Sequence, residues 1–132
     1  MTINILIADD HDQVHQQVKF LLSSEENFQL IGAAKTGQEA LQMARALRPD
    51  MVLMDIRMPG MNGIEAACQL KTEMPKLKVL FLTNYDLEIY RDVAKACGAS
   101  AYILKGSMFN SLIPAIQEIS KTGGLNVFLN PD

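Results

Sequence analysis

The sequence predicts an α/β fold in which a doubly wound parallel sheet of five strands carries helices on both faces. Short apolar runs alternate along the 132 residues with longer segments whose apolar residues recur at helical spacing. The short runs are apolar at consecutive positions, which is typical of parallel strands buried on both faces. The length suits one domain, and a hydrophobic content of 48% is enough for one continuous core.

The expected strands are short and rich in β-branched or other apolar residues. They cover residues 3–8, 28–34, 51–54, 79–82 and 101–104. The second run is more mixed in character than the others, which indicates an edge strand. Right-handed crossovers leave few topologies for five such units, and the flavodoxin-like strand order 2-1-3-4-5 is the leading one.

Each strand is followed by a segment with one apolar helical face. The faces are formed by Val14, Val18, Leu21 and Leu22; by Leu41, Ala44 and Leu47; by Ile64, Ala67 and Cys68; by Tyr90, Val93, Ala94 and Cys97; and by Leu112, Ala115, Ile116 and Ile119. We expect the Asp10 carboxylate to cap the first helix, Pro49 to end the second, and Gly98 to follow the fourth. Pro114 is tolerated in the last helix only if it lies in the first turn.

Polar and charged residues follow four of the five strands. Asp9 and Asp10 come after the first strand, Asp55 after the third, Thr83 at the end of the fourth and Lys105 at the end of the fifth. Carboxyl ends of parallel strands lie at one edge of the sheet, where this topology has its ligand crevice. Taken singly, such residues are ordinary helix caps, strand-end hydroxyls or solvated charges. Their occurrence together at four strand ends predicts one shared site.

Three carboxylates that lie close together raise each other's pKa unless a cation neutralises them. Oxygen ligands without a paired His or Cys favour Mg²⁺ over zinc. A carboxylate beside Mg²⁺ is a suitable nucleophile toward phosphorus, because phosphoryl transfer chiefly demands positioning and charge neutralisation. We therefore expect Asp55 to accept a phosphoryl group, with Lys105 supplying a positive charge and Thr83 a hydrogen bond to its oxygens.

The charges and the apolar runs argue against two classes of binding. The formal net charge is −3 and the Lys and Arg residues are scattered, so we expect no direct nucleic-acid binding. The apolar runs are far shorter than the roughly 20 residues that cross a bilayer, and the N-terminus has no basic leader. We therefore expect a cytoplasmic protein without a membrane segment.

Two residue pairs have no expected role in this site. Cys68 and Cys97 lie in separate helical segments without a C-x-x-C spacing, so we expect two reduced thiols in or near the core. His11 and His15 lie one helical turn apart and have no obvious third ligand, which favours solvated histidines over a metal site.

Four segments resemble the receiver-domain family of two-component signalling, and the resemblance extends over essentially the whole chain. They are residues 5–11, 52–63, 79–83 and 98–105. The second of these, VLMDIRMPGMNG, is the most specific. The resemblance implies a phosphoryl-accepting regulatory domain that is no enzyme beyond its own phosphorylation and dephosphorylation.

The resemblance also implies a role for each residue at the sheet edge. Asp55 corresponds to the phosphoacceptor. The implied Mg²⁺ ligands are Asp9, Asp10, Asp55 and the backbone carbonyl of Arg57.

The remaining implied roles belong to the conformational switch. Thr83 and Lys105 correspond to the pair that senses the phosphoryl group, and Tyr102 to the aromatic switch residue. Two positions depart from the wider family pattern. Gly106 stands where many receivers have proline, and Asn84 where many have a small residue.

Within the family, residues 82–85 and 123–129 are similar to the NarL/FixJ (LuxR-type) transcriptional regulators. This similarity implies a receiver domain at 1–122 and, at 123–132, the start of a linker toward an output domain that the chain lacks. The implied output domain binds DNA through a helix-turn-helix. A sensor histidine kinase is the implied phosphodonor, and phosphorylation can bring two copies together as a homodimer.

Three alternatives compete with this interpretation. An Asp-nucleophile phosphatase or phosphotransferase needs an acid two residues after the nucleophile, where Arg57 stands. A flavin-binding protein of this topology needs a phosphate-cradling loop after the first strand, where Asp9 and Asp10 would repel a phosphate. The third is a stand-alone or non-phosphorylated receiver that acts as a protein-interaction module.

Overall fold

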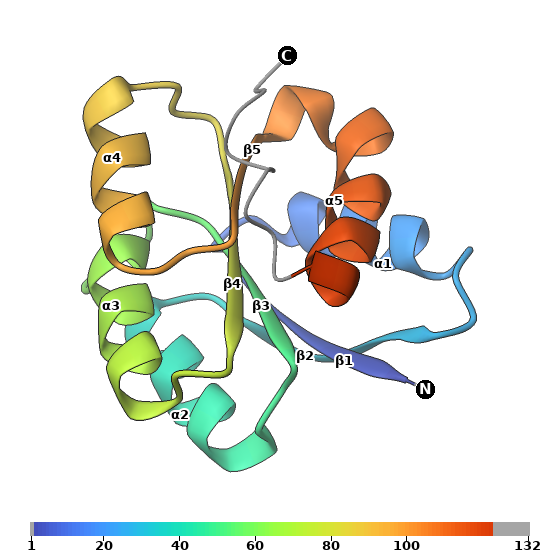
Figure 1. Cartoon of the computed structure of the whole chain (residues 1–132), viewed down its shortest axis with the longest axis horizontal. Coiled ribbons are helices and arrows are strands. Elements are labelled where there is room, and N and C mark those ends of the chain that lie inside the picture. Colours follow the sequence, from blue (N-terminus) through green and yellow to red (C-terminus); the bar gives the residue numbers. More distant parts are fainter. Residues whose placement is uncertain (1, 123–132) are drawn as a thin grey trace.

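The fold of the chain is a five-stranded parallel sheet with helices on both faces (Figure 1). The computed structural model describes residues 2–122. Its elements, in chain order, are β1 Ile3–Ala8, α1 Asp12–Leu22, β2 Phe28–Ala34, α2 Gly37–Leu47, β3 Met51–Met54, α3 Gly63–Glu73, β4 Lys78–Thr83, α4 Glu88–Ala96, β5 Ala101–Leu104, a 3₁₀ turn Lys105–Ser107, and α5 Met108–Thr122. The strand order is β2-β1-β3-β4-β5, so the predicted fold class, strand order and edge position of β2 are confirmed.

The sheet separates two hydrophobic cores. Helices α1 and α5 cover one face, and α2, α3 and α4 cover the other (Figure 1). Successive side chains of a strand point to opposite faces, so Ile5 and Ile7 of β1 pack toward α1 and α5, while Leu6 packs toward the other layer. This arrangement explains why the central strands are apolar at consecutive positions.

The edge strand β2 changes face part-way along its length. Its parallel register with β1 shifts between Ile5 and Leu6, so that Ile31 is an extra residue on β2. Before the shift, Phe28 packs in the core with α1 and α5. After it, Ala34 packs in the core with α2 and α3, although the two residues are an even number apart. The mixed character of this run in the sequence therefore has a structural cause.

The expected cap of the first helix is wrong. The residue before α1 is His11, and its side chain makes no capping hydrogen bond. The Asp10 carboxylate lies 3.1 Å from the His11 ring nitrogen Nδ1 instead. Side-chain caps begin the next two helices, where Thr36 accepts from the Glu39 N–H and Asn62 from the Glu65 N–H.

The expected position of Pro114 is also wrong. It lies in the interior of α5, which begins at Met108, and not in the first turn. Pro114 is exposed, and Asn110, whose carbonyl loses its helical donor, is exposed as well. Water can therefore satisfy that carbonyl, and the apolar face of Leu112 and Ile116 still packs in the core.

The expectation of two reduced thiols is wrong for the form of the chain described by the structure. Cys68 of α3 and Cys97, which caps the C-terminus of α4, are joined by a disulfide. The two helices are neighbours on one face of the sheet (Figure 1), and the Cα atoms lie 4.9 Å apart, within the range of natural disulfides.

The apolar face expected on α4 is buried only at Ala94, whereas Val93 is 39% exposed. Gly98 follows this helix with a positive φ of 90°, as predicted.

The helices differ clearly from membrane-spanning ones. Within residues 2–122, none combines the length and the apolar content that crossing a bilayer requires. The sequence segment 123–129, which contributed to the subfamily resemblance, lies outside the described residues.

Gly63 lies where the fold leaves no room for a side chain. The Gly63 N–H donates to the Ile56 carbonyl (2.7 Å), and a Cβ atom at Gly63 would overlap the backbone carbonyl of Asp55. We predict that Gly63→Ala lowers the free energy of unfolding by about 2–3 kcal/mol, because the loop after β3 must shift to admit the methyl group. Gly106→Ala is the matched control, since a Cβ there meets open space, and it should change stability by less than about 0.5 kcal/mol. Urea unfolding followed by circular dichroism measures both; equal stability of the two variants would contradict the prediction.

Candidate functional site

Two buried carboxylates meet at the carboxyl edge of the sheet. Asp9 follows β1, and its N–H donates to the Ala34 carbonyl of β2 (2.9 Å). Asp55 follows β3, and its N–H donates to the Ala8 carbonyl of β1 (2.9 Å). Backbone pairing thus holds both residues at the strand ends, as predicted, and both are almost fully buried.

Lys105 joins the two carboxylates. Its Nζ atom lies 2.7 Å from Asp9 Oδ2 and 3.1 Å from Asp55 Oδ2, and its side chain is only 8% exposed. One ammonium group is therefore shared by two acids whose charges would otherwise repel each other in a desolvated site. The prediction that residues after strands one, three and five come together is confirmed.

The surroundings shift the pKa of both partners upward. Burial is the main cause for Asp55, the negative charge of Asp9 adds to it, and Lys105 opposes it. For Lys105, burial would lower the pKa, but the hydrogen bond to Asp9 and the charges of both carboxylates together outweigh it. Lys105 therefore stays protonated at neutral pH, and burial makes ionisation of Asp55 less favourable than that of an exposed aspartate.

Two histidines complete the surroundings of the first acid. The His11 ring nitrogen Nδ1 lies 2.9 Å from Asp9 Oδ1, and the His15 ring nitrogen Nε2 lies 2.6 Å from the Asp9 carbonyl. The expectation of merely solvated histidines is wrong in this respect, although the His11 side chain is 60% exposed. Spacing along the chain did not reveal these contacts because they depend on the turn between β1 and α1.

Four side chains of this edge can share a cation. One ligand atom each from Asp9, Asp10, His11 and Asp55 lies within 4.8 Å of the others. Three of the four ligands offer oxygen, the donor that Mg²⁺ prefers. The residues present therefore fit a hard divalent cation.

Thr83 and Tyr102 both contact Tyr85. Thr83 is fully buried, and its hydroxyl oxygen accepts from the Tyr85 N–H (3.2 Å). The Tyr102 hydroxyl donates to the Tyr85 carbonyl, and burial raises the pKa of Tyr102 to about 12. Within the described part of the chain, no hydrogen bond joins Thr83 to Asp55. Tyr85 carries no sequence signal for this position, because its contacts with Thr83 and Tyr102 are made by its backbone.

Two arginines pack against these tyrosines. The Arg57 guanidinium carbon lies 4.9 Å from the centre of the Tyr85 ring, and the side chain donates to the Tyr90 hydroxyl at 3.4 Å. The Arg91 guanidinium carbon of α4 lies 4.5 Å from the centre of the Tyr102 ring. The role expected for the Arg57 backbone carbonyl stays a prediction.

Comparison with known proteins identifies the family. Residues 5–117 match the family model of the response regulator receiver domain. The chain belongs to the response-regulator receiver family. Receivers serve phosphorylation-dependent signalling and generally bind Mg²⁺ at an acidic pocket, and this chain has an acidic cluster of Asp9, Asp10 and Asp55.

Individual relatives confirm the predicted NarL/FixJ grouping of this receiver. The chain is 38% identical over 130 residues to the response regulator protein VraR of Staphylococcus aureus, a match that covers 97% of this chain and 60% of VraR. The chain thus spans less than two thirds of the length of that relative. A LuxR-family response regulator from Aurantimonas sp. SI85-9A1 has a TM-score of 0.85 and 29% identity over 90% of this chain and 85% of that one. The signal receiver domain of NarL from Mycobacterium tuberculosis has a TM-score of 0.85 and 28% identity over 92% and 98% of the two chains.

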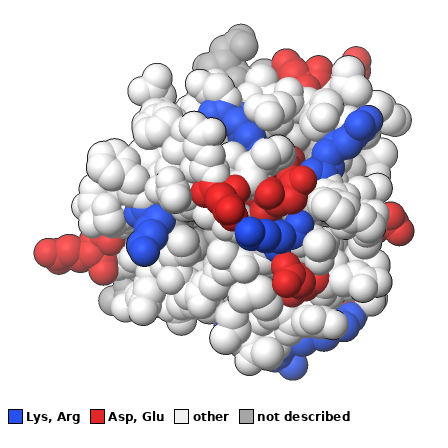
Figure 2. All heavy atoms as spheres, turned by 180° about the vertical axis from the view of Figure 1, so that it is seen from behind, with Lys and Arg blue, Asp and Glu red and all other residues white. Residues whose placement is uncertain are grey.

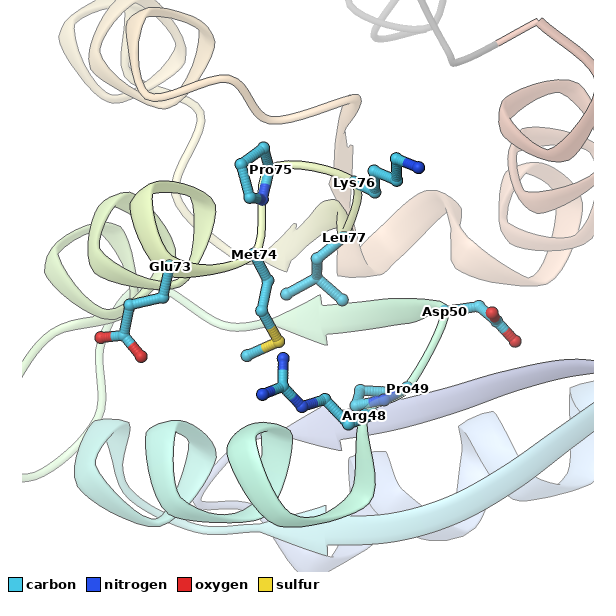
Figure 3. A pocket seen from close by; sticks show the side chains of 8 residues that line it. All are labelled: Arg48, Pro49, Asp50, Glu73, Met74, Pro75, Lys76 and Leu77. Atoms are coloured by element: carbon cyan, nitrogen blue, oxygen red, sulfur yellow. The ribbon is translucent and has the colours of Figure 1, made fainter.

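The charges on one face of the receiver are mixed, and a depression lies away from the carboxylates. Figure 2 shows acidic and basic side chains interspersed on one face, without an extended basic area among the described residues there. The depression in Figure 3 lies before β3 and β4, at the sheet edge opposite the carboxylates. The side chains of Arg48 and Met74 point into it, whereas Asp50 and Lys76 point away (Figure 3).

The raised pKa of Asp55 predicts a stability effect in the receiver. We expect Asp55→Asn to increase the free energy of unfolding at pH 7, on the order of 1 kcal/mol, because the amide removes a disfavoured buried charge. Because the pKa of Asp55 is higher in the folded than in the unfolded chain, its contribution to stability is fully present when the pH is below the unfolded-chain pKa of 3.8. That contribution is lost as the pH rises through the folded-state pKa. The advantage of the variant should therefore disappear below about pH 4.

Urea titrations at several pH values measure this effect. The exposed Asp92 of α4 supplies the control, because Asp92→Asn changes a solvated carboxylate and should leave stability within about 0.5 kcal/mol of wild type. A loss of stability in Asp55→Asn at pH 7 would show that the ion pair with Lys105 outweighs burial.

Proposed function

We propose that Asp55 accepts a phosphoryl group from the phosphohistidine of a sensor histidine kinase. A carboxylate oxygen of Asp55 attacks phosphorus, the bond from phosphorus to the histidine nitrogen breaks, and an aspartyl phosphate forms. The observation that carries the proposal is the position of Lys105, whose ammonium group lies 3.1 Å from Asp55 Oδ2. The same ammonium can remain beside the transferred phosphoryl oxygens and balance their charge.

The acidic cluster supports Mg²⁺ as the cofactor of this reaction. The ligands we propose are the carboxylates of Asp9, Asp10 and Asp55 and the backbone carbonyl of Arg57. Bound Mg²⁺ would neutralise phosphoryl oxygens during transfer. His11 and Lys105 already contact the two oxygens of Asp9, so they orient this carboxylate within the site.

The switch that we propose runs from Thr83 to Tyr102 through Tyr85. A phosphoryl oxygen on Asp55 would attract the Thr83 hydroxyl as a hydrogen-bond donor and change the contact that Tyr85 makes with it. Tyr85 also accepts the hydroxyl of Tyr102, so a shift of its backbone releases that ring. The changed surface comprises α4, β5 and α5. Moving such an equilibrium from 1:99 to 99:1 takes about 5.5 kcal/mol of differential stabilisation.

The wider setting of the domain is part of the same proposal. The receiver occupies residues 1–122, and 123–132 begin a linker to a helix-turn-helix output domain that controls transcription. The protein is cytoplasmic, and phosphorylation favours a homodimer. The match to 60% of VraR supports a longer parent protein. A stand-alone receiver that acts as an interaction module is the second candidate, and the sequence that follows Asp132 in the gene distinguishes the two.

We predict that incubation with acetyl phosphate and Mg²⁺ adds one phosphoryl group to the chain. Intact-mass spectrometry should detect the addition in the wild type and in Asp92→Asn, and no addition in Asp55→Asn. Removal of Mg²⁺ with a chelator should slow the reaction at least about tenfold. A phosphoryl group that persists in Asp55→Asn would place the acceptor elsewhere.

The switch can be tested separately from phosphorylation. We predict that Thr83→Ala still binds beryllofluoride, a phosphoryl mimic, but no longer transmits binding to Tyr102, because the hydroxyl that links the site to Tyr85 is absent. NMR of the Tyr102 ring with and without beryllofluoride measures this. Thr83→Ser retains the hydroxyl and should respond like the wild type. An unchanged Tyr102 response in Thr83→Ala would contradict the proposed route.

A further inference from the structure

A covalent bond joins the helix that precedes β4 to the helix that follows it. The disulfide between Cys68 and Cys97 connects the middle of α3 to the C-terminal end of α4. The two helices lie side by side along one face of the sheet (Figure 1). Neither cysteine belongs to the phosphoryl site, and the proposed function uses neither of them.

Apolar packing fixes α4 only weakly to the domain. Ala94 is its only fully buried residue, Ile89 is 62% exposed and Val93 is 39% exposed. A helix with so little buried apolar surface is held weakly by packing. The disulfide is therefore a large part of what positions this helix.

The other end of α4 is connected to the switch residues. Arg91 of α4 forms an ion pair with Asp86 at 2.8 Å and stacks on the ring of Tyr102. The neighbouring Tyr85 is held by both Thr83 and Tyr102. A change at Thr83 or Tyr102 thus acts on the N-terminal half of α4, while the disulfide holds its C-terminal end against α3.

We propose that Cys68 and Cys97 form a reversible redox tether, which restrains α4 when oxidised and releases it when reduced. The coupling of this tether to phosphorylation rests on the proposed function. The thiols of a cytoplasmic protein are kept largely reduced, and disulfides that form there are mostly transient or regulatory. In the reduced state α4 is free to follow the shift of Tyr85; in the oxidised state that shift is opposed.

The chemistry needs only a small disulfide oxidant such as oxidised glutathione. One cysteine thiolate attacks a sulfur of oxidised glutathione, forms a mixed disulfide and releases one glutathione thiol. The second cysteine attacks the mixed disulfide and releases the second glutathione, so both thiol hydrogens end on glutathione. Reduced glutathione reverses both steps. Both cysteines are half-buried, and Cys68 lines an open groove between α3 and α4, which gives a small thiol access.

The redox step is tested on the whole chain without denaturant. The protein is incubated in buffers of reduced and oxidised glutathione, quenched with acid and alkylated, and the alkyl groups are counted by mass spectrometry. We expect two free thiols in reduced glutathione, none in oxidised glutathione, and the same end points from either direction. A bond that stays closed in reduced glutathione, or thiols that never pair, would overturn reversibility.

Restraint of α4 is measured by hydrogen exchange of its backbone amides. Reduction should increase exchange in Glu88–Ala96 at least about tenfold, because the opened helix loses its strongest constraint. Exchange in β1 and β3 should stay the same. A variant with both Cys68→Ala and Cys97→Ala should exchange like the reduced wild type in either buffer. Equal α4 exchange in the two redox states of the wild type would refute the tether.

Coupling to the proposed switch is measured through beryllofluoride affinity in the presence of Mg²⁺. We expect the oxidised wild type to bind about fivefold more weakly than the reduced form, and the double alanine variant to bind alike in both buffers. Equal affinity of the two wild-type forms would overturn the coupling. If neither form binds, the phosphoryl site itself fails and the coupling with it, whereas thiol counting and hydrogen exchange still decide on the tether.

Discussion

The shared ammonium group of Lys105 is the contact around which the receiver site is organised. Asp9 and Asp55 are buried carboxylates whose charges repel each other, and the Lys105 ammonium group forms an ion pair with both. Asp9, Asp55 and Lys105 are far apart in the sequence and meet because parallel strands end at one edge of the sheet. The strand order therefore brings these charges together. Because two carboxylates share one ammonium group, a further cation is favourable in this site.

Tyr85 connects this charged edge to the packing of the domain. Its N–H and its carbonyl are bonded to Thr83 and Tyr102 respectively, and its ring contacts Arg57. A backbone segment held at both of its polar groups cannot move without disturbing one of its partners. Such an arrangement couples a local change of charge to the position of an aromatic ring.

Much of this architecture could be predicted from the sequence, because its signals are local. Consecutive apolar residues identify buried strands, and the polar residues that follow Ala8, Met54 and Leu104 identify the functional edge. The errors arose where a side chain has a choice of partners. Asp10 lies beside His11 instead of capping a helix, and the pairing of the cysteines depends on which helices become neighbours.

Pro114 shows a related limit. A general rule confines proline to the first turn of a helix, but its cost depends on whether the freed carbonyl meets water or protein. The exposed position of this residue on α5 decides that question. The exposure of Pro114 follows from which side of α5 packs against the sheet, and the neighbouring residues in the sequence indicate this less directly.

The extra residue Ile31 in β2 has a consequence for how this chain aligns with its relatives. Removing it would restore strict two-residue alternation and leave Phe28 and Ala34 on the faces that they occupy now, because the two residues would then be an odd number apart. The bulge therefore absorbs the extra residue, and the residues on either side of it keep the helical layer that their β1 partners face. An alignment with a relative whose edge strand lacks the bulge needs a gap of one position here, and a comparison without that gap would pair core residues with residues from the wrong layer.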